Sequence, residues 1–270
     1  MIIGVDIGGT KTAVASFTES GKLLEEKRFE TPKDYDDFLK MLELVANRLE
    51  VGKAKVACVA VPGFISRKEG VVFHLGNLPW QNKSIRRDIS EILGIPVYIE
   101  NDSKLAALSE ARIVKNEFSR VLYITLSTGI NSGLVINGEL SIDVIDSETG
   151  KMPLMHEGKY MAWEDFASGR AFYNKYGQKA VDVEDDEIWK EYSNTVNAGL
   201  GVVCAAYQPE AIIFGGGLGQ RLRKFKPYLE EYLKANLHPL IRQPKALLST
   251  HYRGQSVIYG CYSYAKDKLA

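Results

Sequence analysis

The chain has 270 residues, of which 45% are apolar and 25% charged, an ordinary composition for a globular protein. Lysine plus arginine and aspartate plus glutamate both number 34, so the balanced charge favours neither a nucleic-acid nor a membrane partner. The length suits two lobes of roughly 100–150 residues each.

The three cysteines, Cys58, Cys204 and Cys261, lie in apolar stretches and form no C-x-x-C pair. We therefore expect small core residues in a reducing compartment, and neither disulfides nor a cysteine zinc site. The longest apolar runs are too short to span a bilayer. A signal peptide is not expected, because the first residues lack the basic stretch of such peptides. A cytoplasmic protein is expected.

The first part of the chain alternates strands with helices. Strands are expected at residues 1–6, 12–17, 23–30, 56–61 and 96–100. Helical spacing of Phe38, Leu42 and Val45 predicts an amphipathic helix. Two more helices are expected, one capped by Ser84 and one at 103–114. This alternation is typical of a partly parallel sheet covered on both faces.

The pattern restarts after a polar stretch at residues 116–119. Strands are then expected at 121–125, 134–136, 139–144 and 211–214, and helices at 164–176, 185–207, 221–235 and from about 254. We interpret the restart as an internal duplication that gives an α/β fold of two related lobes facing a ligand cleft. The expected lobes are 1–117 and 118–255, with a C-terminal helix at about 256–270 packing back on the first.

A glycine-containing turn follows the first strand. Its glycines, Gly8 and Gly9, allow close approach of a ligand, their backbone N–H groups can form an anion nest, and Lys11 adds positive charge beside Thr10. Asp6, at the strand end, is placed to hold Mg²⁺ through water. The spacing is neither a P-loop nor a dinucleotide fingerprint. An ordinary tight hairpin explains this segment equally well when it is taken alone.

Two further turns favour a nucleotide site. Ser127, Thr128 and Gly129 occupy the position in the second repeat that Gly8, Gly9 and Thr10 occupy in the first. Three glycines, Gly215, Gly216 and Gly217, lie between a strand and a helix, where adenine could rest on bare backbone. A close helix–sheet contact would require glycine there too. Three such turns at strand ends together indicate a nucleotide in a cleft.

Eight motifs, in order and over essentially the whole chain, resemble the ROK family of repressors, open reading frames and sugar kinases. They are DIGGTK (6–11), VPG (61–63), GNLPW (76–80), END (100–102), LSTGI (126–130), ETG (148–150), EDFASG (164–169) and FGGG (214–217). The resemblance implies the actin-like ATPase (ribonuclease H-like) fold and a glucokinase-type activity that uses ATP and Mg²⁺.

The resemblance also implies residue roles. The first two turns would bind ATP phosphates, and the triple glycine would line the adenosine pocket. Asp102 would take the proton from the attacking sugar hydroxyl. The residues implied to contact the sugar are Gly63, Asn77, Asn101, Asp102, Glu148 and Glu164.

These residue types also suit the chemistry without the family. Phosphoryl transfer depends more on position and charge neutralisation than on a strong base. Asp102 at a helix start would stay ionised, although aspartate before a helix is also a common N-cap. For Glu148 and Glu164 the alternative is an ordinary solvated carboxylate.

The segment after Glu148 departs from the family pattern. The family has a histidine three residues on and then a cysteine-rich zinc loop, whereas this chain has Lys151 and no cysteine in 152–163. We therefore predict no zinc, with Met155, Tyr160, Met161 and Trp163 packing to hold the pocket wall. Lys151 could bind a sugar hydroxyl, pair with a neighbouring carboxylate such as Glu148, or attract an acidic substrate.

Two rival functions follow from these departures. Ser127, Asn131 and Ser132 stand where the family often has glycine and would restrict phosphate approach, so a slow sugar or nucleotide sensor is one alternative. Kinases of amino sugars, N-acetylated sugars or fructose are another. A DNA-binding regulator is not expected, because the phosphate motif begins at Asp6 without room for a helix-turn-helix. Homodimer formation is left open.

Overall fold

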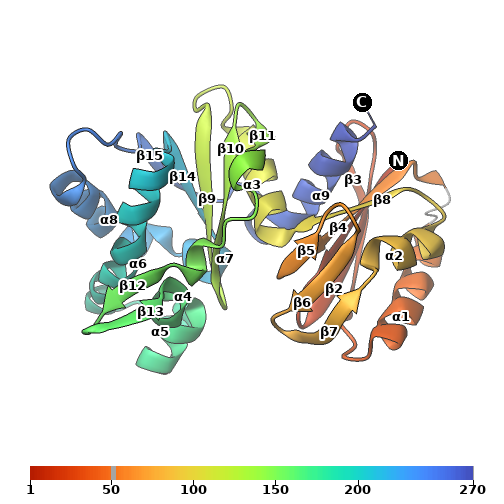
Figure 1. Cartoon of the computed structure of the whole chain (residues 1–270), viewed down its shortest axis with the longest axis horizontal. Coiled ribbons are helices and arrows are strands. Elements are labelled where there is room, and N and C mark those ends of the chain that lie inside the picture. The colour runs from red at the N-terminus through yellow and green to blue at the C-terminus, as the bar shows by residue number, and fades with distance from the viewer. Residues whose placement is uncertain (50–52, 270) are drawn as a thin grey trace. The chain divides into compact units, whose positions relative to one another are not determined.

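The computed structural model describes residues 1–49 and 53–269 and divides into two compact units. Unit 1 comprises Met1–Ser109 with Gln255–Ala270, and unit 2 comprises Glu110–Gly254. Each unit is built around a five-stranded mixed sheet (Figure 1).

The sheet of unit 1 has the strand order β3-β2-β1-β4-β8. β1 pairs antiparallel with β2 and parallel with β4, and β4 pairs parallel with β8. The bounds are β1 (Ile2–Ile7), β2 (Lys11–Phe17), β3 (Leu23–Glu30), β4 (Val56–Val61) and β8 (Val97–Asn101). Because β1 and β4 are parallel, their carboxyl ends meet at one edge, where the first glycine turn begins.

Helices cover both faces of this sheet, as alternation along β4 illustrates. Ala57, Val59 and Val61 share one core with the first two helices, whereas Cys58 and Ala60 share another with the last. The helices are α1 (Tyr35–Arg48), α2 (Ile85–Leu93), α3 (Asp102–Ile113) and α9 (Ser256–Asp267). Every residue of β4 is buried, which is why the strand reads as a continuous apolar run.

A second, three-stranded antiparallel sheet in unit 1 was not predicted from the sequence. Its strands are β5 (Phe64–Ser66), β6 (Val71–Leu75) and β7 (Leu78–Lys83). Register shifts at 64/65 and 74/75 break the two-residue alternation that would have indicated strands. The turn between β6 and β7 carries Asn77.

The sheet of unit 2 repeats this topology with the order β11-β10-β9-β14-β15. β9 pairs antiparallel with β10 and parallel with β14, and β14 pairs parallel with β15. The bounds are β9 (Arg120–Leu126), β10 (Ile130–Ile136), β11 (Glu139–Leu140), β14 (Ala211–Gly215) and β15 (Ala246–Ser249). The shared strand order agrees with the α/β fold and the duplication that the sequence predicted.

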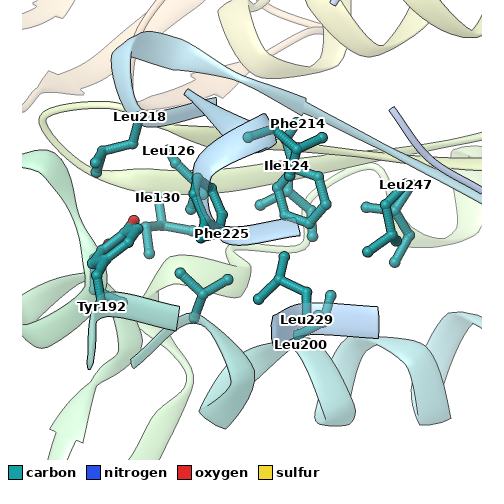
Figure 2. Packing of buried hydrophobic residues seen from close by; sticks show 14 of the residues in the cluster. Ile124, Leu126, Ile130, Tyr192, Leu200, Phe214, Leu218, Phe225, Leu229 and Leu247 are labelled. Atoms are coloured by element: carbon teal, nitrogen blue, oxygen red, sulfur yellow. The ribbon is translucent and has the colours of Figure 1, made fainter. Parts of the chain in front are cut away.

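The core of unit 2 lies between its sheet and two long helices, α6 (Asp186–Tyr207) and α8 (Leu222–Asn236). Ile124 and Phe214 from the sheet meet Leu200 and Phe225 from the helices in Figure 2. This packing fixes the ends of β9 and β14, where the other two glycine turns begin.

Two elements of unit 2 differ from the prediction. The strand expected at 139–144 ends at Leu140, and a 3-10 turn, η2 (Ile142–Val144), follows, with Ile142 70% exposed and so without a face to pack on. The helix expected at 164–176 is broken at Ser168 into α4 (Trp163–Ala167) and α5 (Gly169–Tyr176). A hairpin of β12 (Pro153–His156) and β13 (Lys159–Ala162) precedes them.

The three cysteines are buried free thiols, in agreement with the expectation of core residues. Burial raises the pKa of Cys204 to about 12. Within residues 1–49 and 53–269, no helix combines the length and apolar character that a membrane span requires.

Candidate functional site

The first glycine turn joins β1 to β2 and is a tight hairpin loop. The Gly8 N–H donates to the Lys11 carbonyl at 3.0 Å, which closes the loop. The Thr31 hydroxyl donates to the Gly8 carbonyl at 2.8 Å, and the Thr31 N–H donates to the Thr10 carbonyl at 2.9 Å. The Gly8 N–H is therefore already used, and an anion would depend on Gly9, Thr10 and Lys11.

This turn lies directly against Asn77. A Cβ atom on Gly9 would stand 2.5 Å from the Asn77 Cβ, so only glycine permits this contact. Lys33 spans both segments, because its ammonium donates to the Gly9 carbonyl at 3.1 Å and to the Asn77 carbonyl at 3.3 Å. The Trp80 indole in turn donates to the Lys33 carbonyl at 2.8 Å. Sequence reasoning missed Lys33, since nothing local distinguishes it from other exposed lysines.

Asp6 and Asp102 form a pair of interacting carboxyl groups in unit 1. Asp6 lies near the end of β1, and Asp102 is the first residue of α3, immediately after β8. Burial raises the pKa of Asp6 from 3.8 to about 7, and the negative charge of Asp102 adds to this rise. The positive charge of Arg28 opposes it in part. A carboxyl group of this kind is stabilised in its ionised form by a cation. Asp6 thus fits the magnesium role that the sequence suggested.

The segment before Asp102 is held by several hydrogen bonds. The Asn101 amide donates to the Gly63 carbonyl at 3.2 Å, and its oxygen accepts from the Ser103 N–H at 3.0 Å. Ser103 N–H also donates to the Asp102 carboxylate at 2.7 Å. Gly63 has φ +93°, and a Cβ there would stand 2.2 Å from the His74 carbonyl oxygen. Gly63, Asn101 and Asp102 are therefore brought together.

The second and third turns meet in unit 2. The Ser127 N–H donates to the Gly129 carbonyl at 3.0 Å, and the Gly169 N–H donates to the Ser127 carbonyl at 2.5 Å. Gly216 has φ +77°, and its Cβ would stand 2.3 Å from the Leu126 carbonyl oxygen. The missing side chain of Gly216 therefore lets the third turn pack directly against the main chain that leads into the second. A Cβ on Gly215 would instead meet the Tyr123 hydroxyl at 2.0 Å, a contact within the sheet.

A cavity of about 620 Å³ opens beside these turns, within unit 2. Ser127, Thr128 and Gly217 line it. Residues of its wall that sequence reasoning missed are Gly169, Arg170, Tyr173, Lys179, Ala180, Val181, Leu218, Gln220 and Arg221. The volume and lining of this cavity suit a nucleotide. Its wall combines glycine and hydroxyl groups with the exposed apolar side chains of Tyr173 and Val181.

The expected sugar carboxylates of unit 2 lie on either side of Lys151. Glu164 accepts from the Ile130 N–H at 3.2 Å and forms an ion pair with the Lys151 ammonium. Lys151 therefore pairs with Glu164, whereas Glu148 accepts from the Asn131 amide at 3.2 Å. A Cβ on Gly129 would stand 2.8 Å from the Glu164 carboxylate, so the second turn and Glu164 are in direct contact.

Asn131 and Ser132 lie in β10 and take part in local hydrogen bonds. The Ser132 hydroxyl is 3.0 Å from that of Thr149, and Asn131 binds Glu148. Both side chains thus hold the segment around Glu148, and neither lines the 620 Å³ cavity. Only Ser127 of the three substituted positions does so.

The wall expected from four packed side chains is only half correct. Trp163 is fully buried and Met161 packs against the core of unit 2, but Met155 is 55% exposed and Tyr160 76% exposed. These two are cross-strand partners on the solvent side of the β12–β13 hairpin. Among the described residues, no three His, Cys, Asp or Glu side chains gather as metal ligands.

Comparison with known proteins places these observations in a family. The sequence profile of the ROK family matches residues 2–268. An N-acetyl-D-glucosamine kinase from Haemophilus influenzae is 30% identical over 91% of this chain and 92% of its own length. A glucokinase from Streptomyces coelicolor is 26% identical, covering 81% and 82%.

A solved structure shares the fold. The ROK family glucokinase from Streptomyces griseus, in complex with glucose and AMPPNP, superposes with a TM-score of 0.79 at 23% identity. The alignment covers 98% of this chain and 99% of that one. The two-sheet α/β architecture is therefore that of the family's sugar kinases.

Proposed function

Because this chain belongs to the ROK family and its relatives include sugar kinases, we propose that it is an ATP-dependent kinase of a neutral hexose or N-acetylated hexosamine, with Asp102 as general base. The observation that carries the proposal is the placement of two carboxyl groups in unit 1, Asp6 near the end of β1 and Asp102 at the start of α3, where their charges interact. One carboxylate would hold a cation and the other would accept a proton, which are the two tasks that phosphoryl transfer assigns to acidic residues.

Asp102 has the features of a positioned base. It begins α3, where the helix N-terminus favours the ionised carboxylate. Its neighbour Asn101 is anchored to Gly63 and Ser103, so both side chains start from a fixed main chain. A bound hydroxyl would donate its proton to Asp102 as its oxygen attacks the γ-phosphorus, and the bond from that phosphorus to the bridging oxygen of ADP would break.

The donor site is supported by the cavity beside Ser127, Thr128 and Gly217. Gly216 lets two backbone segments of unit 2 pack closely beside this cavity. Unit 1 offers its own groups that suit phosphate oxygens, namely Lys11 and the Gly9 and Thr10 backbone. Magnesium, bound through Asp6, would neutralise charge on the phosphates.

The acceptor site is supported by the cluster of Glu148, Glu164 and Lys151. Both carboxylates accept hydrogen bonds, and carboxylate oxygens are the acceptors that sugar hydroxyls require. Two carboxylates outweigh one ammonium, so the local charge is negative and disfavours a sugar acid. The lysine contributes a donor where the family has histidine.

An ADP-release assay with ATP and Mg²⁺ tests this function. We expect turnover with glucose, mannose or N-acetylglucosamine and none with gluconate or glucuronate. Asp102→Asn should abolish transfer by at least about 10³-fold while sugar binding, followed by calorimetry, persists. The kinase assignment fails if no sugar raises ADP release above background in folded protein.

A slow sensor is the second candidate, and the closed Ser127 turn favours it. The Ser127 N–H is bonded to the Gly129 carbonyl and cannot donate to phosphate without opening the turn. A sensor would bind sugar and nucleotide at micromolar concentrations with turnover below about one per minute. Calorimetry and the ADP assay on one preparation separate the two functions.

A further inference from the structure

Glu100 is a fully buried carboxylate that immediately precedes the proposed acceptor-activating pair, Asn101 and Asp102. Arg67 holds it at both oxygens, with Nε donating to Oε2 at 2.7 Å and Nη2 donating to Oε1 at 2.6 Å. The Asn101 N–H donates to the same Oε1 at 2.7 Å. One carboxylate therefore fixes both a guanidinium plane and the main chain at residue 101.

The strand β5 is tied to this segment at both ends. Gly63, before β5, accepts from the Asn101 amide at 3.2 Å, and Arg67, after β5, binds Glu100. The Arg67 carbonyl in turn accepts from Arg86 Nη1 at 3.1 Å. Consecutive residues of β8 are thus anchored to two residues that flank β5 and lie four positions apart. This restrains both the position and the rotation of the main chain.

The bidentate geometry in this arrangement comes from the Arg67 guanidinium. Cys58 and Tyr264 face the carboxylate, and its charge contributes to raising the pKa of both. A thiol and a phenol are neutral at physiological pH and supply one weak or single donor each. The bidentate hold therefore depends on arginine.

We propose that the Arg67–Glu100 ion pair is a positioning device that sets the orientation of Asn101 and Asp102 toward the sugar hydroxyl. The proposal rests on the proposed function, in which Asp102 is the base. Buried ion pairs add little net stability over apolar pairs of similar size, so stability alone gives no reason for this one. Misplacement of a catalytic group by about 1 Å costs about 100-fold in rate.

The test removes both charges together, so that neither is left buried alone. Arg67→Met combined with Glu100→Met should fold, lower kcat for the sugar about 30- to 100-fold and leave the KM for ATP within about twofold. Arg67→Lys keeps the charge but loses the bidentate geometry, and should lower kcat about three- to tenfold. Leu42→Ala, a core truncation elsewhere in unit 1, is the control, with lower Tm and unchanged kcat.

The outcomes are distinguishable from those of the proposed function. The positioning role is overturned if the folded double variant keeps kcat within twofold, or if kcat and the KM for ATP deteriorate together. It is also overturned if Leu42→Ala loses as much kcat at equal Tm. If the double variant does not fold, Arg67→Lys decides, and wild-type kcat there overturns the role. Persistent activity of Asp102→Asn would instead remove the base assignment.

Discussion

Replacing Asp6 by asparagine should stabilise the magnesium-free protein at alkaline pH. The pKa of Asp6 is raised from 3.8 to about 7, first by burial and then by the charge of Asp102. A carboxyl group whose pKa is raised on folding contributes stability that is fully present below pH 3.8 and is lost as the pH rises through 7. Asparagine has no such loss.

The size of the effect follows from linkage. A difference of about 3 pH units at about 1.4 kcal/mol each gives about 4 kcal/mol for ionising Asp6 in the folded state. About 1.6 kcal/mol of this stability is already lost at pH 5, so about 2.5 kcal/mol is lost between pH 5 and pH 8. Asp6 is largely buried but keeps some contact with solvent, which screens part of this energy, so we expect about 2 kcal/mol.

Hydrogen exchange of peptides from β1 and β2 can measure this effect within unit 1. The experiment compares wild type with Asp6→Asn in EDTA, and asks how much more stability the wild type loses between pH 5 and pH 8. Groups that titrate in both proteins cancel. Asp102→Asn should shrink the difference without removing it, because burial is the larger cause. Magnesium should narrow the gap by stabilising the wild type at pH 8. Equal pH dependence in both proteins would refute the reasoning, since the Asp6 carboxylate would then not be destabilised.

Three further predictions concern unit 2. Gly216→Ala forces a side chain against the Leu126 carbonyl at positive φ, so it should lower both the Tm and the affinity for ATP. Gly217→Ala is the matched control, because a Cβ there meets open space, and calorimetry should show the wild-type Tm. Lys151→Met removes a partner of Glu164 and should raise the KM for sugar about tenfold with unchanged KM for ATP in steady-state assays. Elemental analysis should find no stoichiometric zinc, and a zinc-selective chelator should leave the Tm unchanged.

The sequence was most informative where structure depends on neighbours along the chain. Alternation and apolar runs located the central strands, because a strand buried on both faces leaves a continuous run such as β4. The glycine turns were found because tight turns and close approach require missing side chains. Motif resemblance then related Asp102 and Glu164 to one reaction, which spacing alone could not do.

Contacts between distant segments could not be predicted in this way. Lys33 is an exposed lysine in the sequence, and only the folded chain brings its ammonium to the Gly9 and Asn77 carbonyls. Lys151 had several carboxylates within reach, and only the folded chain shows that it meets Glu164. The solvent-facing hairpin misled the packing prediction, because apolar composition does not reveal which face of a two-stranded element is covered.

The repeated fold suggests why each half needs glycine in its turn. In unit 1 the missing side chain of Gly9 admits Asn77, and in unit 2 that of Gly129 admits the Glu164 carboxylate. Each turn that we propose binds phosphate therefore packs on a residue that we propose contacts the sugar. A turn that tightens around a phosphate would move its own sugar contact, and by thermodynamic reciprocity sugar binding would tighten the turn.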